Sequence, residues 1–179
     1  AETRRTSRTI SNLLSFSRQS RMELDQLDIH PLIDKTIFLN SNSLKINKIK
    51  VEKNFSKDIP RITGSEDQLQ QVFMNIISNA SEAMETRGGV LGIETAYSPA
   101  KDRVIISFRD TGVGIPGENI SKLFEPFFTT KKIGKGVGLG LSVAYGIIQD
   151  HQGTIHVESV AEEGTTFVVE LPVKPALKN

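Results

Sequence analysis

A row of amide side chains within residues 68–84 is the first group that could do chemistry. In QLQQVFMNIISNASEAM, Asn75 and Asn79 lie one helical turn apart, on the face opposite an apolar stripe. Amide carbonyl oxygens suit a hard cation such as Mg²⁺ that keeps phosphate oxygens and waters among its ligands. The same pattern is typical of an ordinary solvated helix face, so this segment alone leaves both interpretations open.

A second group follows in ISFRDTGVGIPG, where a predicted strand ends at Asp110 and glycines come directly after it. The spacing of three glycines matches the GxGxxG fingerprint of dinucleotide-binding folds. That interpretation fails because the strand belongs to a predicted hairpin and Pro116 interrupts the helix that the fingerprint requires. A carboxylate at a strand end can instead accept a hydrogen bond from the exocyclic amine of adenine, with Gly112 and Gly114 letting the backbone approach the base. A plain Asp-Gly turn is the alternative.

Alternating glycines in GKGVGLGLS, residues 134–142, lead directly into a predicted helix. Backbone N–H groups at a helix N-terminus form an anion site, for which phosphate is the natural ligand. The run lacks the GKS or GKT of a Walker A loop, and the chain has no HRD or DFG segment of the serine/threonine kinases. Just upstream, Lys131 or Lys132 could contact a terminal phosphate.

Three phenylalanines flank Pro126 in LFEPFFTTKK, residues 123–132. Aromatic side chains exposed on a loop indicate docking onto another surface. A small satellite hydrophobic cluster would give the same pattern. The sequence favours neither interpretation.

The elements that must hold these groups follow from hydrophobic spacing. Ser65 and Gln68 form a capping box, which predicts the start of the helix that carries the two asparagines. Apolar residues at helical spacing predict helices over 4–27, 31–38, 65–85, 119–124 and 139–149. Alternating apolar residues predict strands over 48–55, 90–97, 102–110, 154–160 and 165–173, of which the second and third, and the last two, form antiparallel hairpins. Helices and antiparallel strands in runs predict an α+β fold, built as a two-layer α/β sandwich.

Composition excludes several classes of protein. Lys and Arg number 22 against 21 Asp and Glu, so the net charge of +1 gives no case for nucleic acid or an anionic membrane as the main partner. The absence of cysteine excludes disulfides and cysteine-bound zinc and suits a reducing compartment, so we expect a cytoplasmic protein. The sequence contains neither a signal peptide nor an apolar stretch that could cross a membrane.

Five segments closely resemble, in this order, the N, G1, F, G2 and G3 boxes of the sensor histidine kinase catalytic domain, in the GHKL ATPase superfamily. They are NIISNASEAM, DTGVGIP, FEPFFTTK, GKGVGLGLS and EGTTF. NASEAM and EPFFTTKKIGKGVGLGLSVAYGI are similar in particular to the nitrogen-regulator type. The resemblance implies the GHKL (Bergerat) ATP-binding fold, with ATP and Mg²⁺ bound, Asn79 as the metal ligand, Asp110 and Thr165 at adenine, and an ATP lid over 124–137. The nucleotide-binding residues that it implies are Asn75, Asn79, Asp110, Gly112, Gly114, Ile115, Lys131, Gly136, Val137, Gly138, Leu139, Gly140, Leu141 and Thr165.

The resemblance also separates phosphoryl transfer from hydrolysis. The chaperone, gyrase and mismatch-repair ATPases of the superfamily carry a glutamate one turn before the metal-binding asparagine, where it activates water. This chain has Asn75 there, and an amide is no general base. We therefore expect transfer of the γ-phosphoryl group to a histidine. Many members have a basic residue where this chain has Glu82, and this departure weakens the case for a phosphate contact at that position. The alternatives are a conformational-switch ATPase, a non-catalytic nucleotide-binding scaffold and a serine-phosphorylating relative of the anti-sigma factors.

The phosphoacceptor of the family lies in a helix, in a His-acid dipeptide with a proline nearby. None of His30, His151 and His156 matches this pattern, so each is expected to be structural or at the surface. Residues 1–27 look like the second helix of a dimerisation hairpin, and 28–175 like the catalytic domain, with the acceptor upstream. The resemblance implies a homodimer, with this phosphoacceptor domain and a response regulator receiver domain as partners. The chain should bind ATP without phosphorylating itself.

Overall fold

The computed structural model describes residues 24–131 and 137–175. Its helices are α2 (Ile29–Ile46), α3 (Glu66–Ala83), α4 (Gly117–Ile120) and α5 (Gly140–Asp150). Its strands are β1 (Asp25–Leu27), β2 (Ile49–Phe55), β3 (Ile62–Gly64), β4 (Gly89–Ser98), β5 (Arg103–Asp110), β6 (Thr154–Val160) and β7 (Gly164–Pro172). Within the described ranges, none of the helices has the length and apolar character needed to cross a membrane.

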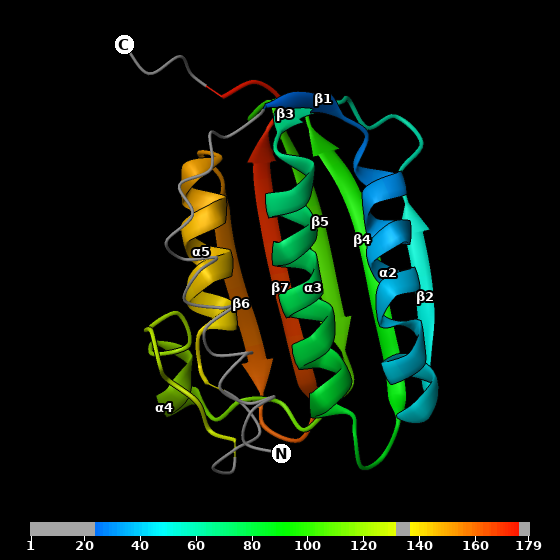
Figure 1. Cartoon of the computed structure of the whole chain (residues 1–179), viewed down its shortest axis with the longest axis vertical. Helices are drawn as coiled ribbons and strands as arrows, with labels where there is room; N and C mark the ends of the chain where they lie inside the picture. The colour runs from blue at the N-terminus through cyan, green and yellow to red at the C-terminus, as the bar shows by residue number, and fades with distance from the viewer. Residues whose placement is uncertain (1–23, 132–136, 176–179) are drawn as a thin grey trace, which may run out of the picture.

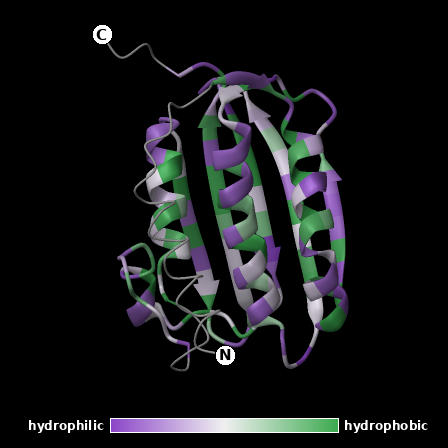
Figure 2. Ribbon diagram, viewed as in Figure 1, coloured by the Kyte–Doolittle hydropathy of each residue, from purple (hydrophilic) through white to green (hydrophobic). Residues whose placement is uncertain are grey.

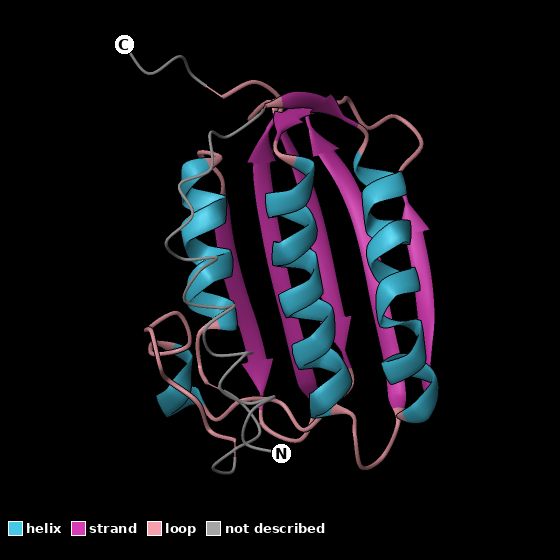
Figure 3. Ribbon diagram, viewed as in Figure 1, coloured by secondary structure: helices cyan, strands magenta, loops and turns pink. Residues whose placement is uncertain are grey.

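The elements form two layers. A five-stranded sheet in the order β2-β4-β5-β7-β6 is one layer, and α2, α3 and α5 lie side by side across one of its faces (Figures 1 and 3). Neighbouring strands are antiparallel except for β2 and β4, which run parallel. β1 and β3 pair as a separate ribbon at one end of the sandwich. The predicted α/β sandwich and both predicted hairpins, β4–β5 and β6–β7, are confirmed.

The core lies between the layers and is centred on α3. Along β5, Ile106 and Phe108 are buried and Ser107 between them is more exposed, as expected for a strand with one face on a core. Phe108 meets Phe73 of α3 with ring centroids 5.5 Å apart. Hydrophilic and hydrophobic residues alternate around α2, α3 and α5 in Figure 2, which fits helices with one buried face. The predicted apolar stripe of α3 is buried in full: Leu69, Val72, Phe73, Ile76, Ile77, Ala80 and Met84.

Two local predictions are wrong. Asp25–Leu27 form β1 and pair with β3, although a helix was expected over 4–27; residues 4–23 of that helix lie outside the described part of the chain. Ser65, the N-cap of α3, makes no side-chain capping hydrogen bond, so the predicted capping box is absent. Its backbone N–H donates instead to His151 Nε2 at 3.0 Å. The start of α3 is therefore held by His151, a residue far away in the sequence.

His151 is a buried structural histidine at the end of α5. Because Nε2 accepts from Ser65, the proton lies on Nδ1, which donates to the Ile147 carbonyl at 2.8 Å. Burial lowers the pKa of His151, and the hydrogen bond to Ile147 and the charge of Asp150 only partly oppose this effect. Gly64 packs so closely that an added Cβ would lie 3.1 Å from His151 Cδ2. The side chain therefore ties α5 to β3 and to the start of α3.

We expect His151 to make the fold less stable in mild acid. Its pKa in the native state lies below the value of about 6.5 in the unfolded chain. The unfolded chain therefore binds the proton more readily, and the free energy of unfolding falls as the pH drops below about 6.5 toward the native pKa. His151→Gln keeps an acceptor for the Ser65 N–H and does not titrate, so it should reduce the stability lost between about pH 7.5 and about pH 5.5 in urea denaturation.

His156→Gln is the matched control, because His156 is exposed on β6. This variant should keep the pH dependence of the unmodified chain. An equal reduction in both variants would show that the effect does not come from burial of His151.

Candidate functional site

The predicted site residues gather at one end of the sandwich, the lower end in Figure 1. The last turns of α3, the end of β5, the start of α5 and the start of β7 all meet there. Asp110 and Thr165 are direct partners in the β5–β7 register, which joins segments far apart in the sequence. The antiparallel sheet thus brings the strand-end carboxylate to the β6–β7 turn.

Asp110 is a buried carboxylate, with only 4% of the residue exposed. Its Oδ1 accepts a hydrogen bond from the Gly112 N–H at 2.9 Å. Burial raises the pKa of Asp110, and hydrogen bonds from the backbone N–H groups of Gly112 and Thr165 oppose this rise. No ion pair of Asp110 occurs within the described residues, so these N–H groups, and not a cation, stabilise its charge.

The glycines after Asp110 are required by the protein's own packing. An added Cβ at Gly112 would lie 2.7 Å from Ala83 Cβ and 2.8 Å from Asp110 Oδ1. Gly114 has a φ of 64°, and a Cβ there would lie 2.0 Å from the Val160 carbonyl oxygen. The sequence prediction that they give a base room to approach is therefore incomplete, because α3 and the β6–β7 turn already fill the space where a Cβ would lie.

Ser159 was missed by the sequence prediction, although it holds the same loop. Its Oγ accepts a hydrogen bond from the Ile115 N–H at 2.8 Å and donates to the Gly164 carbonyl at 2.9 Å. Thr165 Oγ1 lies 2.9 Å from it. The available signal was a polar residue at an inward position of the alternating strand TIHVESV, in register with Thr165. Ser159 thus connects the loop after β5 to the start of β7.

Asn75 faces α5, and its Nδ2 donates to the Gly140 carbonyl at 2.8 Å. The Gly140 Cα also lies against Asn75, since an added Cβ would be 3.5 Å from its amide group. Asn75 therefore fixes the first turn of α5 relative to α3. This is a structural contact within the site, at the position where a hydrolase would need its general base.

Asn79, one turn later, points to a cationic group. Lys131 Nζ donates to Asn79 Oδ1 at 3.1 Å and also pairs with the carboxylate of Glu82. Glu82 thus brings a basic side chain to the asparagine, although it replaces a basic residue of the family pattern. Asn79 Oδ1 fits the first coordination shell of Mg²⁺, because it is a neutral oxygen already facing a positive charge. Within the described residues, no cluster of three or more His, Cys, Asp or Glu side chains could hold a metal ion.

The start of α5 has the features of an anion site. Its N-cap residue, Leu139, offers no side-chain hydrogen bond, so the first-turn N–H groups of Gly140 and Leu141 lack a side-chain cap. Gly138 has a φ of 72°, and its carbonyl accepts from the Phe127 N–H at 2.9 Å. Val137 is partly exposed beside it. Gly136 and Lys132 lie outside the described residues.

The phenylalanines of the loop before α5 divide between the two interpretations. Phe124 packs against the core and meets Tyr145 of α5 with ring centroids 5.3 Å apart, as in a satellite cluster. Phe127 is 65% exposed, which fits a docking residue. This segment therefore contains both a residue of a satellite cluster and an exposed aromatic residue.

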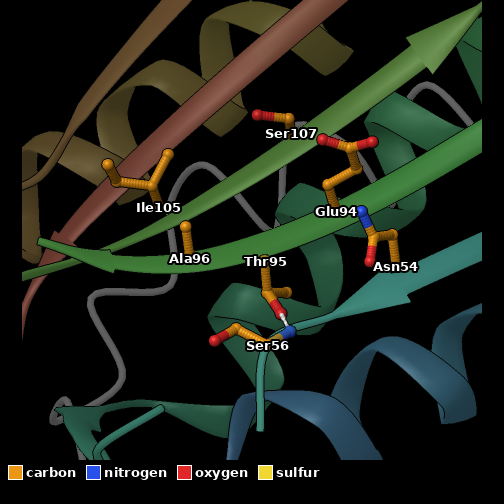
Figure 4. A pocket seen from close by; sticks show the side chains of 7 residues that line it. All are labelled: Asn54, Ser56, Glu94, Thr95, Ala96, Ile105 and Ser107. Atoms are coloured by element: carbon orange, nitrogen blue, oxygen red, sulfur yellow. Dashed lines mark hydrogen bonds between the residues drawn. The ribbon is translucent and has the colours of Figure 1, made fainter. Parts of the chain in front are cut away.

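A separate depression of about 330 Å³ lies on the sheet face that the helices leave open (Figure 4). Asn54, Glu94 and Ser107 point into it from neighbouring strands, and Thr95 Oγ1 accepts from the Ser56 N–H at 3.1 Å beside it. None of the predicted site residues lines it. The chemistry predicted from the sequence therefore belongs to the end of the sandwich and not to this depression.

Comparison with known proteins matches residues 64–175 to the family of histidine kinase-, DNA gyrase B- and HSP90-like ATPases. Sporulation kinase A of Bacillus subtilis (strain 168) is 37% identical over 166 residues, which cover 92% of this chain and 27% of that protein. Sporulation kinase E of the same strain is 34% identical over 174 residues, which cover 97% of this chain and 23% of that protein. The chain spans about a quarter of the length of these two curated relatives.

Solved structures show the same similarity. The nucleotide-free catalytic domain of the histidine kinase ThkA is 30% identical with a TM-score of 0.75, covering 86% of this chain and 98% of that domain. Full-length ShkA in complex with AMPPNP is 25% identical with a TM-score of 0.81, covering 94% of this chain and 36% of ShkA. ThkA in complex with the response regulator TrrA is 28% identical with a TM-score of 0.80, covering 99% of this chain and 50% of that chain.

The Asn75 contact leads to a test by an isosteric change. Asn75→Asp removes the donor to the Gly140 carbonyl and places a carboxylate against it, which should lower the free energy of unfolding by roughly 1–3 kcal/mol. Asn42→Asp makes the same charge change at an exposed position of α2 and should have little effect. Urea denaturation at neutral pH compares the two. Equal stability of both variants would show that Asn75 does not hold α5.

Proposed function

The chain belongs to the histidine kinase-, DNA gyrase B- and HSP90-like ATPase family, with sensor histidine kinases as its relatives, and from this we propose that it binds Mg-ATP and passes the γ-phosphoryl group to a protein histidine. In this proposal it is the catalytic domain of a two-component sensor kinase, of the nitrogen-regulator type that its N and F boxes resemble. The cytoplasm is the proposed compartment, because the reaction consumes ATP.

Asp110 is the observation that carries the proposal. A buried carboxylate whose hydrogen bonds come from backbone N–H groups still has lone pairs that can accept a hydrogen bond from the exocyclic amine of adenine. Thr165 lies beside it in the sheet register. The AMPPNP complex of ShkA supports this nucleotide class.

The phosphate end of the nucleotide would lie between α3 and α5. The N–H groups at the start of α5 and the ammonium of Lys131 can bind phosphate oxygens, and Asn79 Oδ1 can hold the metal. Magnesium bound there would neutralise charge on the phosphates during transfer. Lys131 would then have to leave Asn79 Oδ1, and its ammonium, still paired with Glu82, could bind phosphate oxygens.

Transfer is favoured over hydrolysis by the contact of Asn75. An amide cannot take a proton from water, and the hydrogen bond from Asn75 Nδ2 to the Gly140 carbonyl holds this side chain in place. Catalysis by positioning and charge neutralisation then needs a nucleophile supplied by another protein segment.

None of the three histidines is proposed as the acceptor. His30 stacks on Phe55 at a centroid distance of 4.6 Å, and His151 is buried with both ring nitrogens in hydrogen bonds. His156 is exposed on β6, outside any helix. We place the acceptor on a dimerisation hairpin to which residues 1–27 contribute, in a homodimer that passes phosphate on to a response regulator. The relative ThkA has been solved in complex with the response regulator TrrA, which supports this kind of partner.

The adenine contact has a direct test. Asp110→Asn keeps the shape but turns an amide donor toward the adenine amine, so affinity for Mg-ATP should fall by about tenfold to a hundredfold in calorimetric titration. Asp102→Asn is the control, because Asp102 is exposed in the β4–β5 turn, where it accepts from the Tyr97 hydroxyl. Unchanged affinity in the Asp110 variant would exclude this site for adenine.

The reaction itself is tested by mixing the chain with labelled Mg-ATP and the acceptor-bearing hairpin of its own kinase. We expect an acid-labile phosphohistidine on the hairpin and no label on the chain. Rapid release of inorganic phosphate by the chain alone would identify a conformational-switch ATPase. Tight ATP binding without transfer to the hairpin would identify a non-catalytic scaffold.

A further inference from the structure

The hydroxyl of Ser159 is the centre of a small hydrogen-bond network at the base of the site. Three groups surround it: the Ile115 N–H at 2.8 Å, the Gly164 carbonyl at 2.9 Å and Thr165 Oγ1 at 2.9 Å. All lie at the junction of the loop after β5 with the β6–β7 turn. A hydroxyl has one hydrogen and two acceptor lone pairs, so three partners use its full capacity.

The directions of these bonds follow from counting hydrogens. An amide N–H only donates and a carbonyl only accepts, so Ser159 must accept from Ile115 and give its single hydrogen to Gly164. The third contact then requires that the Thr165 hydroxyl donate to Ser159. Once its hydrogen is committed in this way, Thr165 Oγ1 can only accept hydrogen bonds from any other group.

Thr165 lies directly beside Asp110, on the same buried face of β5 and β7, and each is only 4% exposed. Asp110 as a carboxylate also accepts only. Together the two residues therefore offer a base two adjacent acceptors and no side-chain donor. The C6 amine of adenine matches this pair, whereas the C6 carbonyl of guanine is itself an acceptor and would face two others.

We infer that Ser159 is a positioning residue for base selection: by holding the Thr165 hydroxyl as an acceptor, it makes the site reject purines with a carbonyl at C6. The inference deepens the proposed function and rests on it, because it assumes that the base binds at Asp110. Without Ser159, the Thr165 hydroxyl could rotate and donate to such a carbonyl. Selectivity at this site would then depend on preventing a hydrogen bond to the C6 carbonyl as well as on binding the C6 amine.

The test measures the affinities of the whole chain for Mg-ATP and Mg-ITP, because inosine has the C6 carbonyl and the N1–H of guanosine but lacks its 2-amine. The unmodified chain should prefer ATP. In Ser159→Ala the ratio of the ITP to the ATP dissociation constant should fall by about threefold to tenfold, the worth of one neutral hydrogen bond. If the role of Ser159 were purely structural, the variant would lose affinity for both nucleotides equally, and the ratio would not change.

Companion variants isolate the path of the effect. Thr165→Val removes the acceptor and should lower the ratio, and adding Ser159→Ala to it should change the ratio no further, because Ser159 acts through Thr165. Ser159→Thr keeps a hydroxyl and should restore the preference. Ser43→Ala is the control, since it breaks a similar 2.8 Å hydroxyl contact, to Ser81, between α2 and α3.

Ser159→Cys, with a thiol that is a weak donor and acceptor, replaces the alanine variant if that variant does not fold. An unchanged ratio in a folded Ser159 variant that still binds ATP would overturn the inference. Failure of the unmodified chain to bind ATP would overturn the proposed function instead, so the two outcomes are distinguishable.

Discussion

The packing of α3 on the centre of the sheet is the contact on which the rest of the molecule depends. One face of this helix is buried from Leu69 to Met84, with Phe73 against Phe108 of β5. Each residue of a helix has a fixed direction relative to its neighbours, so burying this face also fixes where Asn75 and Asn79 point. The apolar core thereby sets the geometry of the polar site, and neither can be altered without the other.

Around this helix, the polar groups of the site hold one another in place. Asn75 fixes α5, Asp110 fixes the loop that follows it, and Ser159 joins that loop to β7. Each bond is made by a partly or fully buried group, where an unmet hydrogen-bonding group would be costly. The end of the site around Asp110 is therefore organised by the protein itself. The end around Asn79 depends on Lys131, whose side chain is about one-third exposed and has fewer constraints.

Local patterns carried most of what could be predicted from the sequence. The stripe of α3 and the two hairpins follow from spacing between near neighbours, and the glycine motifs identified the loops at the site. The parallel pairing of β2 with β4 was not predicted, because no local pattern says which distant strand will be a neighbour. β1 and β3 are three residues each, too short for any period to show.

The start of α3 was predicted with the wrong partner, since His151 lies far away in sequence and its position is set only by the folded chain. The assignment of Asn75 to the nucleotide stays a prediction, and its contact with Gly140 could not be foreseen, because that contact depends on the packing of α5.

The register of β5 with β7 has a consequence for how the chain reaches its native state. Asp110 and Thr165 become neighbours only after the loop, α5 and β6 have been enclosed between them. Contacts between distant parts of a chain require closure of a long loop and form late, whereas the β4–β5 and β6–β7 hairpins need only short turns. A partly folded chain with both hairpins present would therefore lack the Asp110–Thr165 pair. A ligand that needs both residues can stabilise only the completed sheet, so it would act on the last folding step and leave the early ones unchanged.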